Sequence, residues 1–165
     1  MILGMSTGAF TLLHVIISVV AIGSGLIVIG GMFASARLPV TTSIFLFTTA
    51  LTSITGFLFP LTAFTPALGV GIVACVILAI ALIALYGKRL AGPWRWIYVI
   101  TAVISVYLNL FVIVAQSFAK VAALSALAPT QSEPPFAAAQ GLVLASFVLL
   151  ALVAVFRFRP VPAAR

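Results

Sequence analysis

Five long apolar runs, joined by short connections, constrain this chain more than any other feature. They cover about residues 10–33, 40–59, 67–86, 97–118 and 136–156. None of the five contains Asp, Glu, Lys or Arg. A helix of about 20 apolar residues is long enough to cross a bilayer core about 30 Å thick. The sequence therefore predicts an all-α, polytopic membrane protein with five transmembrane helices.

The overall composition agrees with a lipid environment. Of the 165 residues, 65% are hydrophobic and only 5% are charged, whereas a soluble domain carries about 25% charged residues. A soluble chain of this size has too little polar surface to cover so many apolar side chains. We expect residues 1–165 to form a single transmembrane domain, with no soluble domain.

The basic residues indicate how the five spans are oriented. With five spans, seven basic residues fall on one side of the membrane and one on the other, where it is joined by the single acid Glu133. The seven are Arg37, Lys88, Arg89, Arg95, Arg157, Arg159 and Arg165, and the eighth is Lys120. Cytoplasmic loops carry an excess of Lys and Arg. The N-terminus is therefore predicted outside and the C-terminus in the cytoplasm, as in a multi-pass protein of the inner (plasma) membrane.

This topology also accounts for the net charge of +7, so we do not expect nucleic acid as a partner. Membrane lipids are the expected partners, because basic residues near the surface attract anionic headgroups. Trp94 and Trp96 flank Arg95, a pattern typical of the membrane–water interface.

The second run is the least apolar. Thr41, Thr48, Thr52 and Thr55 recur at helical intervals and share one broad face of the predicted helix. Their hydroxyls can bond to carbonyls one turn earlier, so a helix can carry them into lipid. This stripe fits either helix–helix packing or the lining of a polar cavity.

Two ridges of small residues predict close helix packing. Ala67, Gly71, Cys75 and Ala79 form one in the third run, and Ala137, Gly141 and Ala145 form another in the fifth. Small residues let the backbones of membrane helices approach each other. Between the fourth and fifth runs, the Ala-rich residues 121–128 either extend the fourth helix or form a short interfacial helix.

Five hydrogen-bonding side chains are expected in the outer halves of four different helices. They are His14, Thr55, Asn109, Gln116 and Gln140. Lipid offers no partner to an amide, so these side chains should point into the bundle. Two interpretations remain open: they bond to one another and hold the helices together, or they surround a ligand site at His14.

The inventory of catalytic residues is small. The chain has one His, one Cys and one carboxylate, so enzymatic activity is not expected and no metal-ligand spacing exists. No cofactor is expected, with haem or quinone binding at His14 as the alternatives. A haem held between two histidines would need a second chain.

The function favoured by these observations is a non-enzymatic accessory or assembly subunit of a membrane complex. Membrane protein partners or a second copy of the chain would then cover part of its surface. One alternative is an outward-facing small-molecule site around His14, for a quinone, a lipid, haem or a neutral solute. Another is an oligomeric carrier or channel lined by the threonine stripe.

Overall fold

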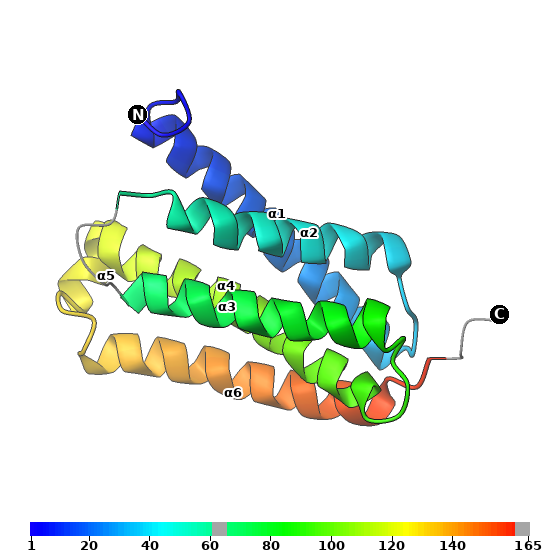
Figure 1. Ribbon diagram of the computed structural model, residues 1–165. Helices are drawn as coiled ribbons and strands as arrows, with labels where there is room; N and C mark the ends of the chain where they lie inside the picture. The colour runs from blue at the N-terminus through cyan, green and yellow to red at the C-terminus, as the bar shows by residue number, and fades with distance from the viewer. Residues whose placement is uncertain (61–65, 161–165) are drawn as a thin grey trace.

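The computed structural model describes residues 1–60 and 66–160. Its helices are α1 (Thr7–Phe33), α2 (Pro39–Phe57), α3 (Pro66–Leu82) continued by the π-helical turn η1 (Ile83–Gly87), α4 (Trp94–Lys120), the short α5 (Ala122–Leu127) and α6 (Pro134–Arg157) (Figure 1). Five of these, with α3 and η1 taken together, are long and apolar enough to cross a membrane. The predicted all-α fold with five spans is confirmed, and each observed helix end lies within three residues of the predicted one.

Local sequence chemistry sets several helix ends. The Ser6 hydroxyl accepts a hydrogen bond from the N–H of Ala9 at 3.2 Å and caps α1. Pro39 opens α2, where a missing N–H costs no helical hydrogen bond. Helix α4 stops at Val121, whose backbone is extended. The Ala-rich segment is therefore a separate short helix, α5, rather than a continuation of α4.

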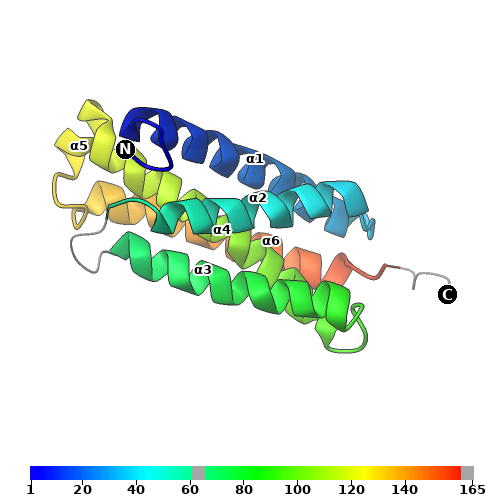
Figure 2. The same cartoon turned by 45° about the horizontal axis from the view of Figure 1, so that its top comes forward.

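Helix α4 lies at the centre of the bundle and packs against α1, α3 and α6, while α1 makes its most extensive contact with α2. The long helices run along one common direction (Figure 2). Val99, Val103 and Val106 of α4 are almost fully buried, and Phe45 of α2 joins them in the core. In contrast, large apolar side chains on the outer faces are exposed, as expected for a surface solvated by lipid.

Gly25 lies where α1 packs tightly against α2 and α4. A Cβ at this position would lie 2.4 Å from Cγ2 of Val106 and 3.0 Å from the ring of Phe45. Both of those side chains are fully buried and cannot move aside. Gly23, on the same helix, has open space around it. Only glycine at position 25 therefore allows α1 to cross α4 at this distance.

The small-residue ridge on α3 is partly confirmed. Gly71 faces α2, because a Cβ there would lie 3.1 Å from the ring of Phe57. Ala79 is exposed, however, and the inward face of α3 is formed by Ala74, Leu78 and Ala81. The side chain of Ala67 lies outside the described part of the chain.

The prediction for the ridge on α6 is wrong. A Cβ at Gly141 would meet no atom within 4 Å, and Ala137 and Ala145 are exposed. The buried face of α6 instead carries Phe147, whose ring lies 5.9 Å from that of Tyr107 on α4. A ring of this size fills the space between two helices, so the α4–α6 contact does not need small residues.

The predicted threonine stripe on α2 is divided between two faces. Thr42 and Thr49 are buried against the bundle, whereas Thr41 and Thr48 are only half-buried. Thr55 bonds to α1, and the Thr48 hydroxyl donates to the Ile44 carbonyl of its own helix at 2.7 Å. The hydroxyls of Thr42, Thr48 and Thr55 thus donate to backbone carbonyls within or next to α2, as hydroxyls carried into lipid commonly do.

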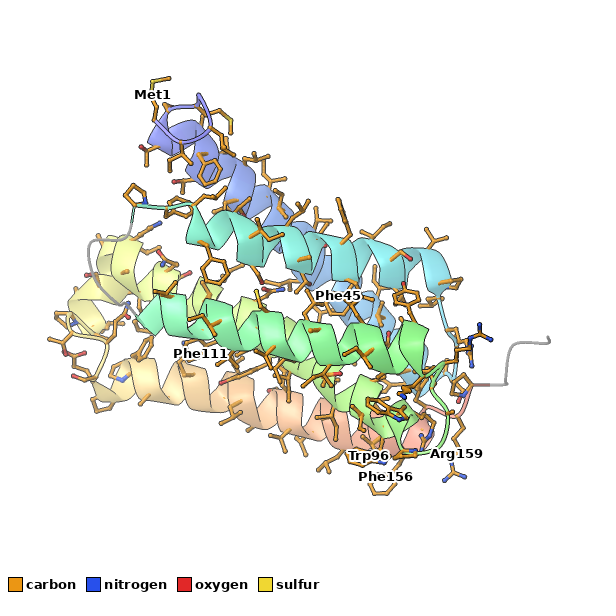
Figure 3. All side chains as sticks on the ribbon, viewed as in Figure 1. Met1, Phe45, Trp96, Phe111, Phe156 and Arg159 are labelled. Carbon is orange, nitrogen blue, oxygen red and sulfur yellow. The ribbon has the colours of Figure 1, made fainter. Side chains whose placement is uncertain are left out.

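Arg159 and Trp96 lie at one end of the bundle (Figure 3), the end that also holds the connections carrying Arg37, Lys88 and Arg89, whereas Lys120 ends α4 at the opposite end. Nη1 of Arg95 donates to the carbonyl of Val155 at 3.0 Å and to the carbonyl of Phe158, at the end of α6. The Ser35 hydroxyl accepts from the backbone N–H of Arg159 at 2.7 Å. The side chains of Arg95 and Ser35 therefore join the start of α4 and the α1–α2 connection to the end of α6 and the residues after it. Arg165 lies outside the described residues.

Candidate functional site

A cavity of about 580 Å³ lies between α1, α2, α3 and α4, in the half of the bundle that ends at Lys120. Pockets for small molecules occupy about 300–1,000 Å³. Helices α1 and α4 touch at Gly25 and Val106, and the cavity lies beyond that contact, where Figure 1 shows the N-terminal half of α1 extending away from α4. We call this space the His14 cavity.

The wall of the His14 cavity is mainly apolar, with a limited set of polar side chains. These polar residues are Thr11, His14, Ser18, Thr52, Ser53, Asn109, Gln116, Ser117 and Lys120. Apolar side chains such as Leu108 and Val112 of α4 and Ala74 of α3 line the remainder. No carboxylate is among the described lining residues, and Lys120 is the cation.

The His14 side chain is held in place by Thr55 of α2 and by Phe59, which follows α2. Its Nδ1 atom lies 2.7 Å from Oγ1 of Thr55. The Phe59 ring stands nearly perpendicular to the imidazole, with centroids 5.3 Å apart. Gly56 adds space on the same side, because a Cβ there would lie 3.8 Å from Cε1 of His14. The ring is therefore held from one side and lines the cavity with the other.

Further hydrogen bonds join the helices around the cavity. The Ser18 hydroxyl donates to the His14 carbonyl at 2.8 Å and to Oγ1 of Thr52 at 3.4 Å. Deeper in the bundle, Nδ2 of Asn109 donates to Oγ1 of Thr49 at 3.4 Å. Interhelical hydrogen bonds in membrane proteins contribute about 0.6 kcal/mol each on average, so these bonds position the wall more than they stabilise the fold.

The cavity opens between α1 and α4. Val15 and Val19 of α1 line it and are 44% and 56% exposed, and Gln116 and Lys120 of α4 line it and are exposed as well. The valines face outward from the bundle, where lipid is the solvent. The opening therefore lies on the apolar outer surface of the bundle, with Lys120 at the helix end.

Glu133, the only acid in the sequence, is engaged within its own loop. Its carboxylate accepts hydrogen bonds from the Thr130 hydroxyl at 2.9 Å and from the N–H groups of Thr130 and Ser132 at 3.1 Å. Partial desolvation raises the pKa of Glu133, but these hydrogen bonds outweigh it and lower the pKa below its usual value. The carboxylate is therefore ionised at neutral pH and does not line the cavity.

Four of the five side chains predicted for the outer polar layer are at or next to the cavity. His14, Asn109 and Gln116 line it, and Thr55 holds His14. The structure does not bring Gln140 to them, because its Nε2 donates to the Phe111 carbonyl at the α4–α6 contact, at 3.1 Å.

Among the polar lining residues that were not anticipated, Ser18 and Lys120 had a spacing that carried a signal. Ser18 follows His14 by four residues, and Lys120 follows Gln116 by four. Residues four apart share a helix face, so each could have been assigned to the cavity together with its neighbour.

No family model, curated protein or solved structure matches this chain. The chemistry of the His14 cavity itself points to a class of ligand. Its walls suit an apolar body, its polar groups suit a head that forms hydrogen bonds, and its lining includes a cation but no acid. An amphipathic molecule satisfies all three conditions.

Proposed function

We propose that this membrane protein binds a small amphipathic molecule, taken from the surrounding bilayer, in the His14 cavity. The observation that carries the proposal is the cavity itself, which combines an apolar interior with a fixed histidine and an opening between α1 and α4. Ligand sites are mostly apolar and contain a few placed polar groups.

The charge of the lining restricts the head group of the ligand. Lys120 would repel a cationic head, and no described lining residue supplies the carboxylate that such a head needs. In a low-dielectric site an unpaired charge is costly. The site therefore favours neutral and anionic amphiphiles over cationic ones.

We further propose that the cavity lies in the outer half of the inner membrane, because the charge imbalance puts the basic end in the cytoplasm. The accessory or assembly role, the carrier alternative and the binding of a quinone or haem stay predictions. Co-purification with stoichiometric partners would support the accessory role, and solute flux into liposomes would support a carrier.

Cysteine labelling tests this orientation. With Cys75 replaced, Ser132→Cys should react with a membrane-impermeant maleimide added to intact cells, and Lys88→Cys should react only after the cells are opened. Both positions are exposed in the structure, so poor access would not explain a difference. Labelling in the reverse order would contradict the orientation.

Filling the cavity should abolish binding. We expect Val112→Trp to reduce labelling of the cavity wall by a photoactivatable 16-carbon amphiphile at least tenfold, because an indole at this lining position occupies space now open in the His14 cavity. The probes are a diazirine-bearing hexadecanol and its methyl ether, and labelled residues are located by mass spectrometry of peptides from protein in nanodiscs.

The matched control is Val148→Trp, which adds the same side chain to the outer face of α6, where Val148 is 49% exposed. This variant should be labelled in the cavity like the parent. If neither probe labels residues 108–117 in the parent above the level on outward-facing α6, the protein does not bind an amphiphile in this cavity.

A further inference from the structure

The hydrogen-bond network around Thr55 determines which ring nitrogen of His14 carries a hydrogen. Oγ1 of Thr55 lies 2.7 Å from the Leu51 carbonyl and 3.2 Å from the Thr52 carbonyl. A carbonyl only accepts, so the Thr55 hydroxyl must donate its one hydrogen to its own helix, as threonines in membrane helices commonly do. Thr55 has no second hydrogen to give to His14.

Thr55 must therefore accept from His14 across their 2.7 Å contact. In the neutral imidazole one nitrogen donates and the other accepts, and the partner of one fixes the state of the other. The hydrogen is thus on Nδ1, and Nε2 carries an unshared pair. Neutral His14 can only accept a hydrogen bond at Nε2.

No residue in the described part of the chain donates to this Nε2. The hydroxyls of three lining serines already donate elsewhere: Ser18 to the His14 carbonyl, Ser53 to the Thr49 carbonyl and Ser117 to the Ile113 carbonyl. Among the described residues, Oε1 of Gln140 is the one fully buried polar side-chain atom without a partner. Nε2 of His14 is consequently accessible rather than sealed, and His14 lines the cavity.

We propose that the ligand is a hydroxyl-bearing amphiphile whose O–H donates a hydrogen bond to Nε2 of His14. This inference rests on the proposed function and specifies the head group. A membrane alcohol, a quinol or a protonated acid can make this bond, whereas an ether, an ester or a quinone lacks the donor. A head without an O–H forgoes the stabilisation of one net hydrogen bond, so the acceptor discriminates against such heads.

The first test uses the fact that His14 is the only histidine in the sequence. Protein labelled with ¹⁵N-histidine should show, at about pH 8 where imidazole is neutral, a protonated Nδ1 and an unprotonated Nε2. Hexadecanol should shift the Nε2 signal, and hexadecyl methyl ether should not. A hydrogen on Nε2, or equal shifts with both compounds, would overturn the proposal.

The second test compares affinities in competition with the photoactivatable probes. Hexadecanol should compete about two- to tenfold better than its methyl ether, which corresponds to one net hydrogen bond. His14→Phe keeps an aromatic ring but removes the acceptor, so the preference should fall to about one. Thr48→Val, which removes a hydroxyl that bonds only within α2, is the control and should keep the preference.

The outcomes separate this inference from the proposed function. Equal cavity labelling by alcohol and ether in the parent would leave the amphiphile site standing and refute the role of His14. A preference for alcohol that survives in His14→Phe would also refute that role. Absence of cavity labelling by either probe would refute the proposed function itself.

Discussion

Gly25→Leu should be the most damaging single substitution in the bundle. A Cβ at this position would lie 2.4 Å from Val106 and 3.0 Å from Phe45, and both neighbours are completely buried. The leucine forces α1 away from α4. We expect a loss of about 3 kcal/mol in the free energy of unfolding, at the upper end of the usual cost of overpacking. The loss is measured by unfolding the purified protein and the variant in an SDS titration.

Gly23→Leu is the matched control for this prediction. It lies on the same helix two residues earlier, and its surroundings are open. Both substitutions replace glycine by leucine within a helix and gain the same helix propensity, about 0.8 kcal/mol. The difference between their free energies of unfolding therefore measures the cost of a larger side chain where α1 crosses α4. Equal stability of the two variants would show that this crossing is not as close as described.

Arg95→Met should give the second large loss. The guanidinium donates to the carbonyls of Val155 and Phe158, where the last carbonyls of α6 have no partners within the helix. Hydrogen bonds to charged groups contribute about 1.5–3 kcal/mol. We expect a decrease in the free energy of unfolding in that range, together with earlier proteolysis of the segment after α6.

Arg37→Met controls for the loss of charge. Arg37 is an exposed residue at the same end of the bundle, so both variants remove one positive charge from the same side. Its side chain makes no hydrogen bond within the described residues, and its removal should change stability by less than about 0.5 kcal/mol. If Arg37→Met is as unstable as Arg95→Met, net charge and not the α6 cap is responsible.

The five spans could be predicted because membrane helices follow from length and polarity alone. Apolar runs without charge, with Pro39 opening the second helix, define the spans to within three residues. Hydrogen-bonding side chains in lipid must find partners, and for this reason His14 and Asn109 were expected to point inward; the structure places both on the wall of the His14 cavity. Neither argument depends on how the helices pack against one another.

Packing itself was not predictable from small-residue spacing. Gly71 and Gly141 sit in similar ridges, yet the first faces Phe57 and the second faces open space. What distinguishes them is the partner: α4 meets α6 through the rings of Tyr107 and Phe147, which keep the backbones apart. Gln140 also lies at this α4–α6 contact, and it is therefore not close to His14. The sequence shows which side chains are small. Which face of a helix points into the bundle depends on the rotation of that helix, and this rotation is set by packing against all its neighbours.

The tautomer of His14 could not be predicted from the sequence either. It depends on Thr55 being placed opposite His14 and on the Thr55 hydroxyl being committed to Leu51. Thr55 and Leu51 are four residues apart, so the second bond is local and could be foreseen. The first joins two helices and requires the register of α1 against α2.

The most direct test of the amphiphile site is a crystal structure of the protein grown with 16-bromohexadecanol, with data collected at the bromine absorption edge. Bromine gives an anomalous signal that no atom of the protein matches. Its position can therefore be located even where the electron density of the ligand's alkyl chain is weak. We expect one strong peak inside the cavity among α1, α2, α3 and α4, with the hydroxyl of the same molecule next to Nε2 of His14. Bromine peaks confined to the outer faces of α3 and α6, with the His14 cavity filled only by water or side chains, would contradict it.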